Sequence, residues 1–498
     1  MKLHDLHFRR RFAKNLYRSL FLDMGGMCLT QDFTKEDKRG APYPVINSSG
    51  MIAESVSCGN YVLSSQVGGS VSRLIGNFFP YCTYSFKIHE LCKAELGFSV
   101  TYDGGSLVCT IRSDDKAKIT FLEKEILLSD AHIAVGDTVE FTFRAGGISI
   151  YQKRNNVTRL LADVSDSDSD GKIKDISSVG LSSLLNEKIY RTANLCLYIN
   201  IQSGGKVSIS DVESKLYCGI AQADIRPMKY EDGTPIFENG RVFFTASERL
   251  ETGAYQSILS LDPTTADFRM EGALFFDLGD GILTNDVASS VIYDRINKEW
   301  YIWFCAFSHG HVLARARLAV DPRHSVSIVD ARTVETKEGA ALTDFCGIFG
   351  DEDPDLLYKD GKWHLAVCRP EKDGYHYYRF TSDDPLDGFV FADRTEAAQT
   401  TGGSFVNFEG EHYFVCGRSF SERAKYDVYD FSILSSPHPM MHIHDDGGFR
   451  GWGSVFGVRI GTRKRYFHIT FDRHLASKKW NWSYGNIYLF EADEYIKL

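Results

Sequence analysis

The sequence has no apolar run that approaches the ~18 to 20 residues needed to span a membrane as a helix. The apolar segment after the basic N-terminus is interrupted by Asp23 and two glycines, so it lacks the continuous apolar core of a secretory signal. Basic residues are not in excess either, because 56 Lys and Arg stand against 66 Asp and Glu, for a net charge of −10. These absences argue against membrane and nucleic-acid partners, and we expect a cytoplasmic protein.

Motifs for several kinds of chemistry are also missing. The eleven cysteines are scattered and form no CxxC pair, so neither a disulfide framework nor a zinc knuckle is indicated. The sequence contains no Gly-x-Ser-x-Gly elbow, phosphate-binding loop or dinucleotide fingerprint. His309 and His311 have the spacing of two ligands on one strand face, as do His442 and His444, but neither pair has an identifiable third ligand. We therefore expect no metal and no cofactor.

The 498 residues suggest two or three domains, and three segments differ in texture. Residues 1–45 join a basic stretch that could form a helix to a polar connector. Residues 46–216 contain short strands in which apolar and polar residues alternate, separated by glycine-rich turns. Such strands at this spacing are typical of an antiparallel β-sandwich. Residues 217–498 carry a longer repeat.

The order of the strands in residues 46–216 resembles the concanavalin-like or laminin-G-like jelly roll. An early edge strand is followed by a strand over residues 136–143 and by a closing strand over residues 207–212. The resemblance implies a domain that binds sugars or that packs beside a catalytic domain.

Five similar hairpins recur after Cys218. Each places a turn and a charged residue before a run of aromatic and aliphatic residues, and they lie about 50 to 60 residues apart. The hairpins cover residues 240–244, 298–304, 361–365, 410–415 and 463–469. Their spacing is that of four-stranded blades in a β-propeller. The sequence therefore predicts an all-β fold, an N-terminal β-sandwich (jelly roll) followed by a five-bladed β-propeller over residues 217–498.

Acidic residues stand at the start of three of the predicted blades. Asp224 lies in Ala-Asp-Ile-Arg-Pro, Asp286 in Thr-Asn-Asp-Val, and Glu352 in an acidic run that ends at Asp355. The first strand of each blade begins near the central channel of a propeller. We therefore expect the three side chains to converge on one cavity despite their separation in the sequence.

These motifs resemble the five-bladed glycoside hydrolases, the group that includes arabinanases, arabinofuranosidases, β-xylosidases and invertase-like fructosidases. In that group an aspartate enters from blade one, a second from blade two, and a glutamate, commonly in a Glu-x-Pro setting, from blade three. The matching residues here are Asp224, Asp286 and Glu352, the last in Glu-Asp-Pro. Blade one departs from the group, since it reads Asp-Ile-Arg-Pro in place of Asp-Pro, and Glu352 has three acidic neighbours.

Hydrolysis of a glycosidic bond needs one protonated carboxyl beside the leaving oxygen and one ionised carboxylate across the sugar ring. Glu352 is our candidate for the general acid, because the charges of its three neighbouring aspartates would raise its pKa. The resemblance implies that Asp224 is the base, or the nucleophile in a retaining enzyme, and that Asp286 tunes the acid and holds the sugar. The alternative is that these acids cap strands or pair with arginines.

Other residues near the predicted blade ends are candidates for binding the substrate. Arginine offers a fixed fork of donors to a carboxylate, a sulfate or vicinal hydroxyls, although the arginines could instead neutralise the acids. Trp452, which stands between glycines, could stack on a sugar or pack within a blade. The candidates are Arg226, His311, Asp353, Arg369, Arg418, Arg450 and Trp452.

The sequence thus predicts a glycoside hydrolase that acts on an oligosaccharide. A propeller channel closed at one end favours a pocket over a groove, so we expect exo-action on a terminal furanosidic or acidic sugar. One alternative is a non-catalytic carbohydrate-binding protein, in which both domains serve as recognition surfaces. Another is a glycan lyase or transferase on the same scaffold.

Overall fold

The computed structural model describes residues 1–27, 45–57, 59–166, 180–398, 400–418, 426–431, 437–438, 441–443, 453–471 and 486–497. These residues contain 36 strands, one α-helix of four residues and two short 3₁₀ helices. The predicted all-β class is therefore confirmed. None of the described helices is long and apolar enough to cross a membrane.

The chain divides into two compact units. One combines residues 1–21 with the residues from Cys218 onward, and the other takes the described residues of 22–217. The chain leaves and re-enters the first unit at one place, since the Cys218 N–H donates to the Leu20 carbonyl at 3.0 Å. The second unit is therefore an insertion into the first.

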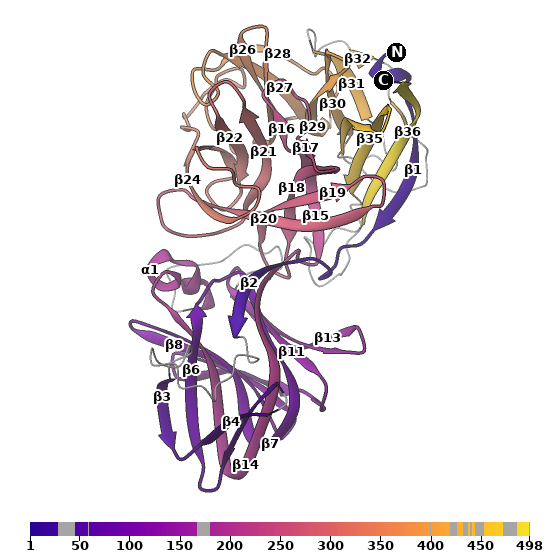
Figure 1. The fold of residues 1–498 in the computed structure, drawn as a ribbon. Coiled ribbons are helices and arrows are strands. Elements are labelled where there is room, and N and C mark those ends of the chain that lie inside the picture. Colours follow the sequence, from indigo (N-terminus) through magenta and orange to yellow (C-terminus); the bar gives the residue numbers. More distant parts are fainter. Residues whose placement is uncertain are drawn as a thin grey trace. The chain divides into compact units, whose positions relative to one another are not determined.

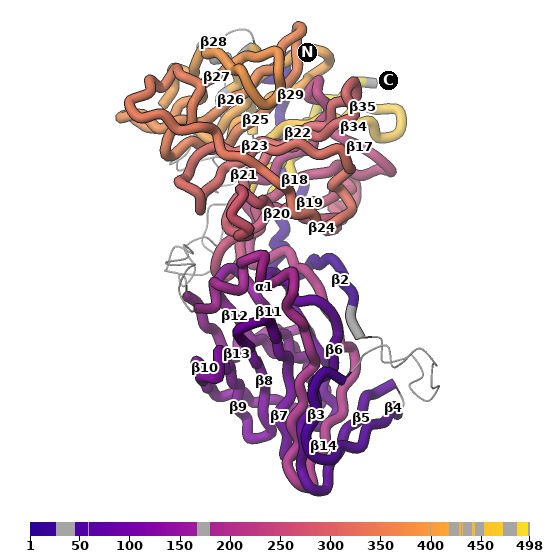
Figure 2. The backbone as a smooth tube through the Cα atoms, turned by 90° about the vertical axis from the view of Figure 1, so that its left-hand side faces the viewer, coloured from indigo at the N-terminus to yellow at the C-terminus, as the bar shows by residue number. Residues whose placement is uncertain are grey.

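The inserted unit is built on one 13-stranded sheet. The long strands β7 and β14 lie beside each other (Figure 2) and pair antiparallel. The rings of Tyr84, Phe86, Phe98 and Phe141 pack together at centroid distances of 5.4 to 5.8 Å and form an aromatic core. The resemblance of this unit to a jelly roll stays a prediction. Its elements are β2 (Phe21–Met27), β3 (Val45–Gly50), β4 (Ala53–Ser57), β5 (Asn60–Ser65), β6 (Gly69–Asn77), β7 (Cys82–Tyr102), β8 (Gly105–Arg112), β9 (Lys116–Phe121), β10 (Lys124–Asp130), β11 (Thr138–Arg144), β12 (Gly147–Arg154), β13 (Val157–Ser165), η2 (Leu181–Leu185), α1 (Glu187–Tyr190) and β14 (Asn194–Tyr217).

The first unit is a propeller of five blades with four main strands each, and the outer strands of blades 1 and 2 pair in parallel, so that these two blades share one ten-stranded sheet (Figure 1). Each of the five predicted hairpins falls on the second strand of a blade, so the predicted blade count is confirmed. Blade 1 is β15 (Ala221–Pro227), β18 (Arg241–Arg249), β19 (Ala254–Asp262) and β20 (Asp267–Asp277); blade 2 is β21 (Asp286–Asp294), β22 (Glu299–Ala306), β23 (Val312–Leu318) and β24 (Val326–Thr333); blade 3 is β25 (Glu352–Lys359), β26 (Lys362–Glu371), β27 (Gly374–Ser382) and β28 (Val390–Arg394); blade 4 is β29 (Thr400–Phe408), β30 (Glu411–Arg418), β31 (Tyr426–Asp430) and β32 (Pro437–His438); blade 5 is β34 (Gly453–Ile460), β35 (Arg463–Phe471), β36 (Ile487–Lys497) and β1 (His7–Lys14). The remaining short elements are η1 (Leu3–Asp5), β16 (Lys229–Tyr230), β17 (Phe237–Glu238) and β33 (His442–Ile443).

Strand β22 shows why the second strands are so apolar. Successive side chains of a strand point to opposite faces, and in a propeller both faces of a blade are covered by its neighbours. Phe304 stacks on Phe276 of blade 1 at a centroid distance of 3.7 Å. Its neighbour Trp303 packs at 5.7 Å against Phe389, in the hairpin between β27 and β28 of blade 3. The continuous aromatic run is therefore a strand buried on both sides.

Blade 5 is completed by the N-terminal part of the chain. Strand β1, in the segment that could have formed a helix, is extended and pairs antiparallel with β36, with Phe8 opposite Ala492 and Lys14 opposite Ile487 (Figure 1). Phe8 is buried in a core cluster with Leu3 and Leu6, whereas the three arginines after it lie on the exposed side. Phe8 alone is buried in this strand, and the register with β36 shifts between Arg10 and Phe12, which fits an outer strand with a bulge.

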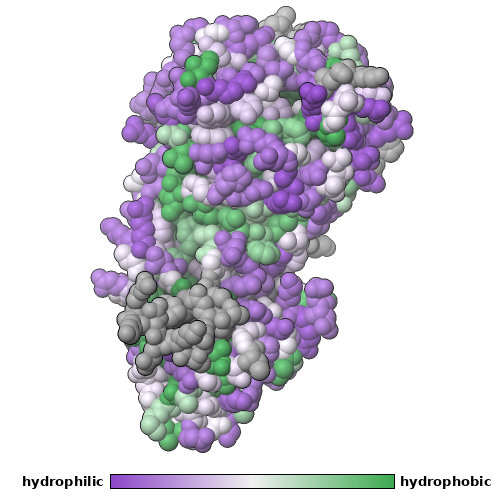
Figure 3. All heavy atoms as spheres, viewed as in Figure 1, coloured by the Kyte–Doolittle hydropathy of each residue, from purple (hydrophilic) through white to green (hydrophobic). Residues whose placement is uncertain are grey.

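Large apolar side chains on the surface are scattered among polar ones. Figure 3 shows this mixture on one face of the molecule. The most exposed of these side chains in the propeller are Val320, Ile296 and Phe349, each at least 73% exposed. Phe349 lies just before the acidic run of blade 3, which places an exposed ring at the start of the predicted site.

Candidate active site

The inner strands of blades 1 to 4 share one local distortion. In each, the register with the second strand breaks for two residues, between Ala223 and Arg226 in β15 and at matching places in β21, β25 and β29. One residue inside each break has a left-handed backbone, with φ between 48° and 59°. A bulge of this kind re-aims the side chains near it and costs backbone strain. The four left-handed residues are Asp224, Ala288, Asp353 and Gly402.

Asp224 lies in the bulge of blade 1 and is 11% exposed. Burial raises the pKa of its carboxyl, the positive charge of Arg249 lowers it, and the negative charge of Asp353 raises it. The net direction is upward. The Arg249 Nη2 lies 3.4 Å from Oδ2 of Asp224. Two further groups, Ser247 and Arg226, also favour the ionised carboxylate.

Glu352 comes directly before the bulge of blade 3, opposite Cys368 in the register, and is 25% exposed. His311, the residue before β23 of blade 2, places its Nε2 3.0 Å from Oε1 of Glu352. Burial raises the pKa of Glu352, the hydrogen bond with His311 lowers it, and the charges of Asp353 and Asp224 raise it, with an upward net direction. Asp224 and Glu352 therefore lie close enough to interact, and no arginine is among the main influences on Glu352.

Asp286 begins β21 and is almost completely buried, at 1% exposed. Its Oδ2 accepts a hydrogen bond from the Thr284 hydroxyl at 3.3 Å and lies 3.2 Å from Nδ1 of His309. Burial lowers the pKa of His309, but Asp286 and Asp280 outweigh this effect and raise it to about 9. His309 is therefore a cation at neutral pH, and Asp286 is its counter-ion.

The acids gather around the buried thiol of Cys305, as their influence on its pKa indicates. Burial is the largest cause of its raised pKa, and the negative charges of four carboxylates follow. Electrostatic influence falls with distance, so all four carboxylates lie near this thiol. They are Glu352, Asp353, Asp286 and Asp351. The predicted convergence of acids from blades 2 and 3 therefore exists in the fold, and Asp224 of blade 1 joins it through Glu352 and Asp353.

The carboxylate of Asp353, a predicted substrate-binding residue, is hydrogen-bonded to the neighbouring blade. Its Oδ2 accepts hydrogen bonds from the Thr401 hydroxyl at 2.7 Å and from the Gly402 N–H at 3.0 Å. Its Oδ1 lies 3.5 Å from Nη2 of Arg226, and Nη1 of that arginine donates to the Pro354 carbonyl at 2.6 Å. Asp353 and Arg226 thus tie blades 1, 3 and 4 together at the edge of the site.

Asp355 lies two residues after Asp353 in β25, and its side chain is 1% exposed. Its carboxylate accepts hydrogen bonds from Lys229 Nζ, the Ser290 hydroxyl and the Phe405 N–H, each at 2.6 Å. These partners come from β16, from β21 of blade 2 and from β29 of blade 4, and all three are buried. Asp355 is therefore a structural hub and does not crowd Glu352 with an uncompensated charge.

Asp351 and Arg369 form a buried pair behind the site. Arg369 is completely buried, and it donates to the Asp344 carbonyl at 2.9 Å and to the Cys346 carbonyl at 2.8 Å. Its Nε lies 3.3 Å from Oδ1 of Asp351, whose pKa burial raises to about 7. Arg369 therefore holds the loop before β25 and offers no exposed surface to a ligand, contrary to the substrate-binding role expected for it.

The other predicted binding residues have different outcomes. His311 lies at the site, beside Glu352. Arg418 ends β30, opposite Thr400 in the register. Arg450 and Trp452 lie outside the described residues.

Four site residues were missed from the sequence. Arg249 and Ser247 lie at the end of β18, where an otherwise apolar strand becomes polar, and this change was a usable signal. Phe349 contacts His311 edge-on at 5.6 Å and is 73% exposed, so it is placed to meet a ligand. Tyr375 of β27 lies near Glu352, because the charge of Glu352 follows burial as a cause of its raised pKa.

One group of metal-ligating side chains occurs among the described residues, away from the predicted histidine pairs. Glu371, Asp373 and His376 have ligand atoms within 4.8 Å of one another. The Arg394 guanidinium lies 3.3 Å from Glu371 and 3.0 Å from Nδ1 of His376. This positive charge disfavours a cation at the cluster.

Comparisons with known proteins do not assign the chain to a family. No family model and no curated protein matches it. Among solved structures it is similar to Zg3597, a family 117 glycoside hydrolase of the marine bacterium Zobellia galactanivorans (12% identity, 55% of this chain and 84% of that chain, TM-score 0.37). It is also similar to Bacillus subtilis levansucrase (11%, 56% and 87%, TM-score 0.39) and to the catalytic domain of the Coprinopsis cinerea GH62 alpha-L-arabinofuranosidase (14%, 55% and 93%, TM-score 0.36).

Proposed function

We propose that the propeller is a glycoside hydrolase whose acid is Glu352 and whose base or nucleophile is Asp224. The observation that carries this proposal is that two carboxyls from different blades lie within electrostatic reach of each other, both with raised pKa values. Glycosidic hydrolysis uses such a pair, with one member protonated and one ionised.

The surroundings of the two carboxyls support the division of roles. Two arginines, Arg249 and Arg226, favour the ionised form of Asp224, which suits a base or nucleophile. Glu352 has no comparable cation among its main influences and lies beside the charges of Asp353 and Asp224, which favour its protonated form. Burial raises the pKa of Glu352 more than the neighbouring negative charges do. The sequence pointed to crowding by charges, so the main physical reason for a protonated Glu352 is a different one.

We base exo-action on the buried hydrogen bonds of Asp355. The buried carboxylate of Asp355 joins blade 3 to β16, blade 2 and blade 4, which suits a channel that is closed at this level. A site that ends in a wall admits the terminal sugar of a chain. Asp286 and His309 form one side of the acid cluster, and the exposed ring of Phe349 suits stacking on a sugar face.

The substrate class we propose is a terminal furanosidic sugar first and an acidic sugar second. Arg226 and Arg249 both contact acids of the site, at 3.5 and 3.4 Å. An acidic sugar would have to compete with those carboxylates for the guanidinium groups, whereas a neutral furanoside would not.

The test compares Glu352→Gln with the unmodified protein on aryl glycosides of differing leaving groups, including arabinofuranosides, fructofuranosides, xylosides, galactosides and glucuronides. Loss of a general acid costs about 10²- to 10⁴-fold with a poor leaving group and much less with dinitrophenolate, which needs no proton. Glu299→Gln is a matched control, since Glu299 is 28% exposed, similar to Glu352, but lies at the other end of its blade.

Two outcomes contradict the proposal. If Glu352→Gln lowers the rate equally for all leaving groups, Glu352 is not the acid. If the unmodified protein binds oligosaccharides but hydrolyses none of them, the protein is a carbohydrate-binding protein.

A further inference from the structure

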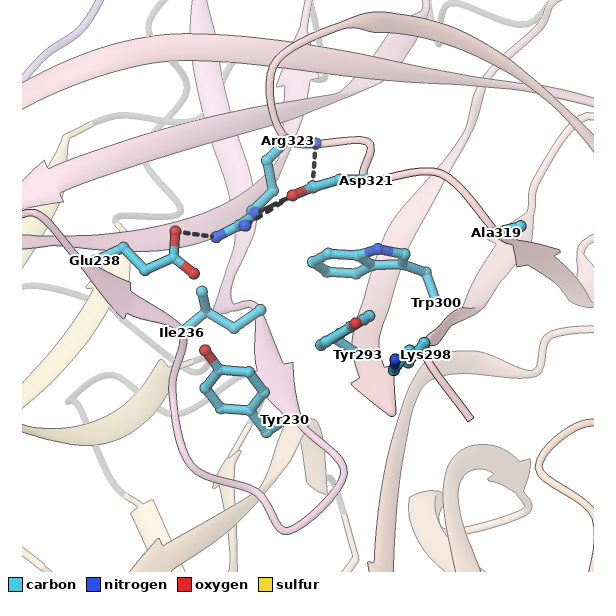
Figure 4. A pocket seen from close by; sticks show the side chains of 9 residues that line it. All are labelled: Tyr230, Ile236, Glu238, Tyr293, Lys298, Trp300, Ala319, Asp321 and Arg323. Atoms are coloured by element: carbon cyan, nitrogen blue, oxygen red, sulfur yellow. Dashed lines mark hydrogen bonds and ion pairs between the residues drawn. The ribbon is translucent and has the colours of Figure 1, made fainter. Parts of the chain in front are cut away.

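A second pocket lies at the far ends of the strands that carry the acids. Its volume is about 260 Å³, and it is lined by residues of blades 1 and 2 (Figure 4). Asp286 begins β21, whereas Tyr293 of the pocket lies one residue before the end of the same strand. Asp286 and Tyr293 are seven positions apart, which corresponds to ~23 Å along the strand. The pocket and the acid cluster are therefore distinct sites.

Aromatic rings form two sides of this pocket, where the half-buried Tyr230 and Tyr293 offer ring surface and Trp300, at 3% exposed, packs behind them. Figure 4 shows Trp300 and Tyr293 on one side of the gap and Tyr230 on the other. The Tyr293 and Trp300 rings lie 4.8 Å apart, and Tyr230 meets Tyr293 edge-on at 6.3 Å. Arg295, which is not part of the lining, lies over the Tyr230 ring at 4.6 Å. The rings are therefore held in place by packing before any ligand arrives.

Arg323 crosses the top of the pocket as a fixed planar group. Its Nη2 lies 2.7 Å from Asp321 and its Nη1 lies 2.9 Å from Glu238, as drawn in Figure 4. The guanidinium also lies over the Trp300 ring at 5.6 Å. The pocket thus presents donors and acceptors side by side, and its two cations, Arg323 and Lys298, balance its two carboxylates.

We propose that this pocket binds one neutral sugar ring of a glycan, as a non-catalytic second site. Aromatic faces stack on the C–H faces of a sugar, and a guanidinium flanked by carboxylates can satisfy hydroxyl groups, which both donate and accept. The charge balance disfavours an anionic ligand, because the carboxylates would repel it. The volume falls below the ~300 to 1,000 Å³ of pockets for drug-sized ligands, which fits a single ring.

The pocket is tested by binding, so the result does not depend on hydrolysis. The full chain with Glu352→Gln is titrated calorimetrically with arabinose, xylose, galactose, fructose and glucose and with their linear tri- to pentasaccharides. We expect Tyr230→Ala and Arg323→Lys each to weaken the binding of at least one of these sugars tenfold or more. Tyr495→Ala, at an exposed tyrosine of β36, is the control and should leave the affinity unchanged.

A second variant covers the case in which these changes disturb folding. Ala319 is an exposed lining residue, so Ala319→Trp fills the pocket without removing a packed side chain and should abolish the same binding event. Ligand-induced change in tryptophan fluorescence should disappear in Trp300→Phe. The proposal is overturned if no sugar of the panel binds, or if binding persists unchanged in Ala319→Trp, Tyr230→Ala and Arg323→Lys. A loss of hydrolysis in Glu352→Gln with this binding intact separates the two sites.

Discussion

His311 and Glu352 are hydrogen-bonded between two blades, with 3.0 Å from Nε2 to Oε1. The contact lowers the pKa of Glu352 against the larger upward effect of burial. His311 itself is held between Phe307, at 4.7 Å, and Phe349, at 5.6 Å. The imidazole is thus placed to set the pH range over which Glu352 keeps its proton.

Replacing His311 should move the pH profile of hydrolysis. In His311→Ala the lowering influence is lost, so the pKa of Glu352 rises further. A general acid works while it is protonated, so the alkaline limb of kcat/KM against pH should shift to higher pH. His132→Ala, at a histidine that is 73% exposed in the inserted unit, should leave the limb in place. A shift of the limb to lower pH would contradict the assignment of Glu352 as acid.

Removing Asp355 should destabilise the propeller strongly. Asp355→Ala leaves the Lys229 ammonium buried without its counter-ion, and such a loss costs about 3 to 5 kcal/mol of unfolding free energy. Urea denaturation measures the change. Asp383→Ala, at an aspartate that is 82% exposed, should stay within about 0.5 kcal/mol. Adding Lys229→Met to Asp355→Ala should recover part of the loss, and a further loss would argue against the hub.

Glu248 should make stability depend on pH. Burial raises its pKa in the folded protein to about 8, against hydrogen bonds from Ser257 and Gln222 that lower it. The unfolded chain gives up this proton near pH 4.5, so the stabilisation is complete below that pH. It is lost at about 1.4 kcal/mol per pH unit as the pH rises to about 8. Glu248→Gln should flatten this slope in denaturation curves measured from pH 5 to pH 8, and an unchanged slope would contradict a buried, protonated Glu248.

The inserted unit should be removable. The chain enters and leaves the propeller where Leu20 and Cys218 are hydrogen-bonded, so a short Gly/Ser linker can replace residues 22–217 without moving either end. We expect the shortened protein to be monodisperse, to keep its β-rich circular dichroism and to hydrolyse small aryl glycosides. An insoluble product, alongside a soluble full chain, would show that the propeller needs the insertion to fold.

The blades could be predicted from the sequence because each repeats a strong local pattern. The aromatic run of β22 and the spacing of the five hairpins identify strands buried on two sides. Strand β1 could not be predicted in the same way. Its partner β36 is almost the whole chain away, and a lone strand with one buried residue carries little local signal.

The site was predictable as a gathering of acids but not in its pairings. The acids Asp353, Asp355 and Glu352 are close in the sequence, yet the first binds blades 1 and 4, the second binds β16 and blades 2 and 4, and the third faces His311. A left-handed residue in a bulge decides which way each carboxyl points, and no residue type marks that position, since Asp, Ala and Gly all occupy it.

The pairing of β1 with β36 has a consequence for synthesis of the protein. At ~5 to 20 residues per second, the roughly 480 residues between the two strands take about 24 to 96 s to emerge. For that time Phe8 and its apolar neighbours have no blade to join, and the edge of β1 stays open to other chains. The three arginines that follow Phe8 put positive charge on this unpaired edge. We expect their mutual repulsion to disfavour pairing between two unfinished chains, so these residues oppose aggregation during synthesis.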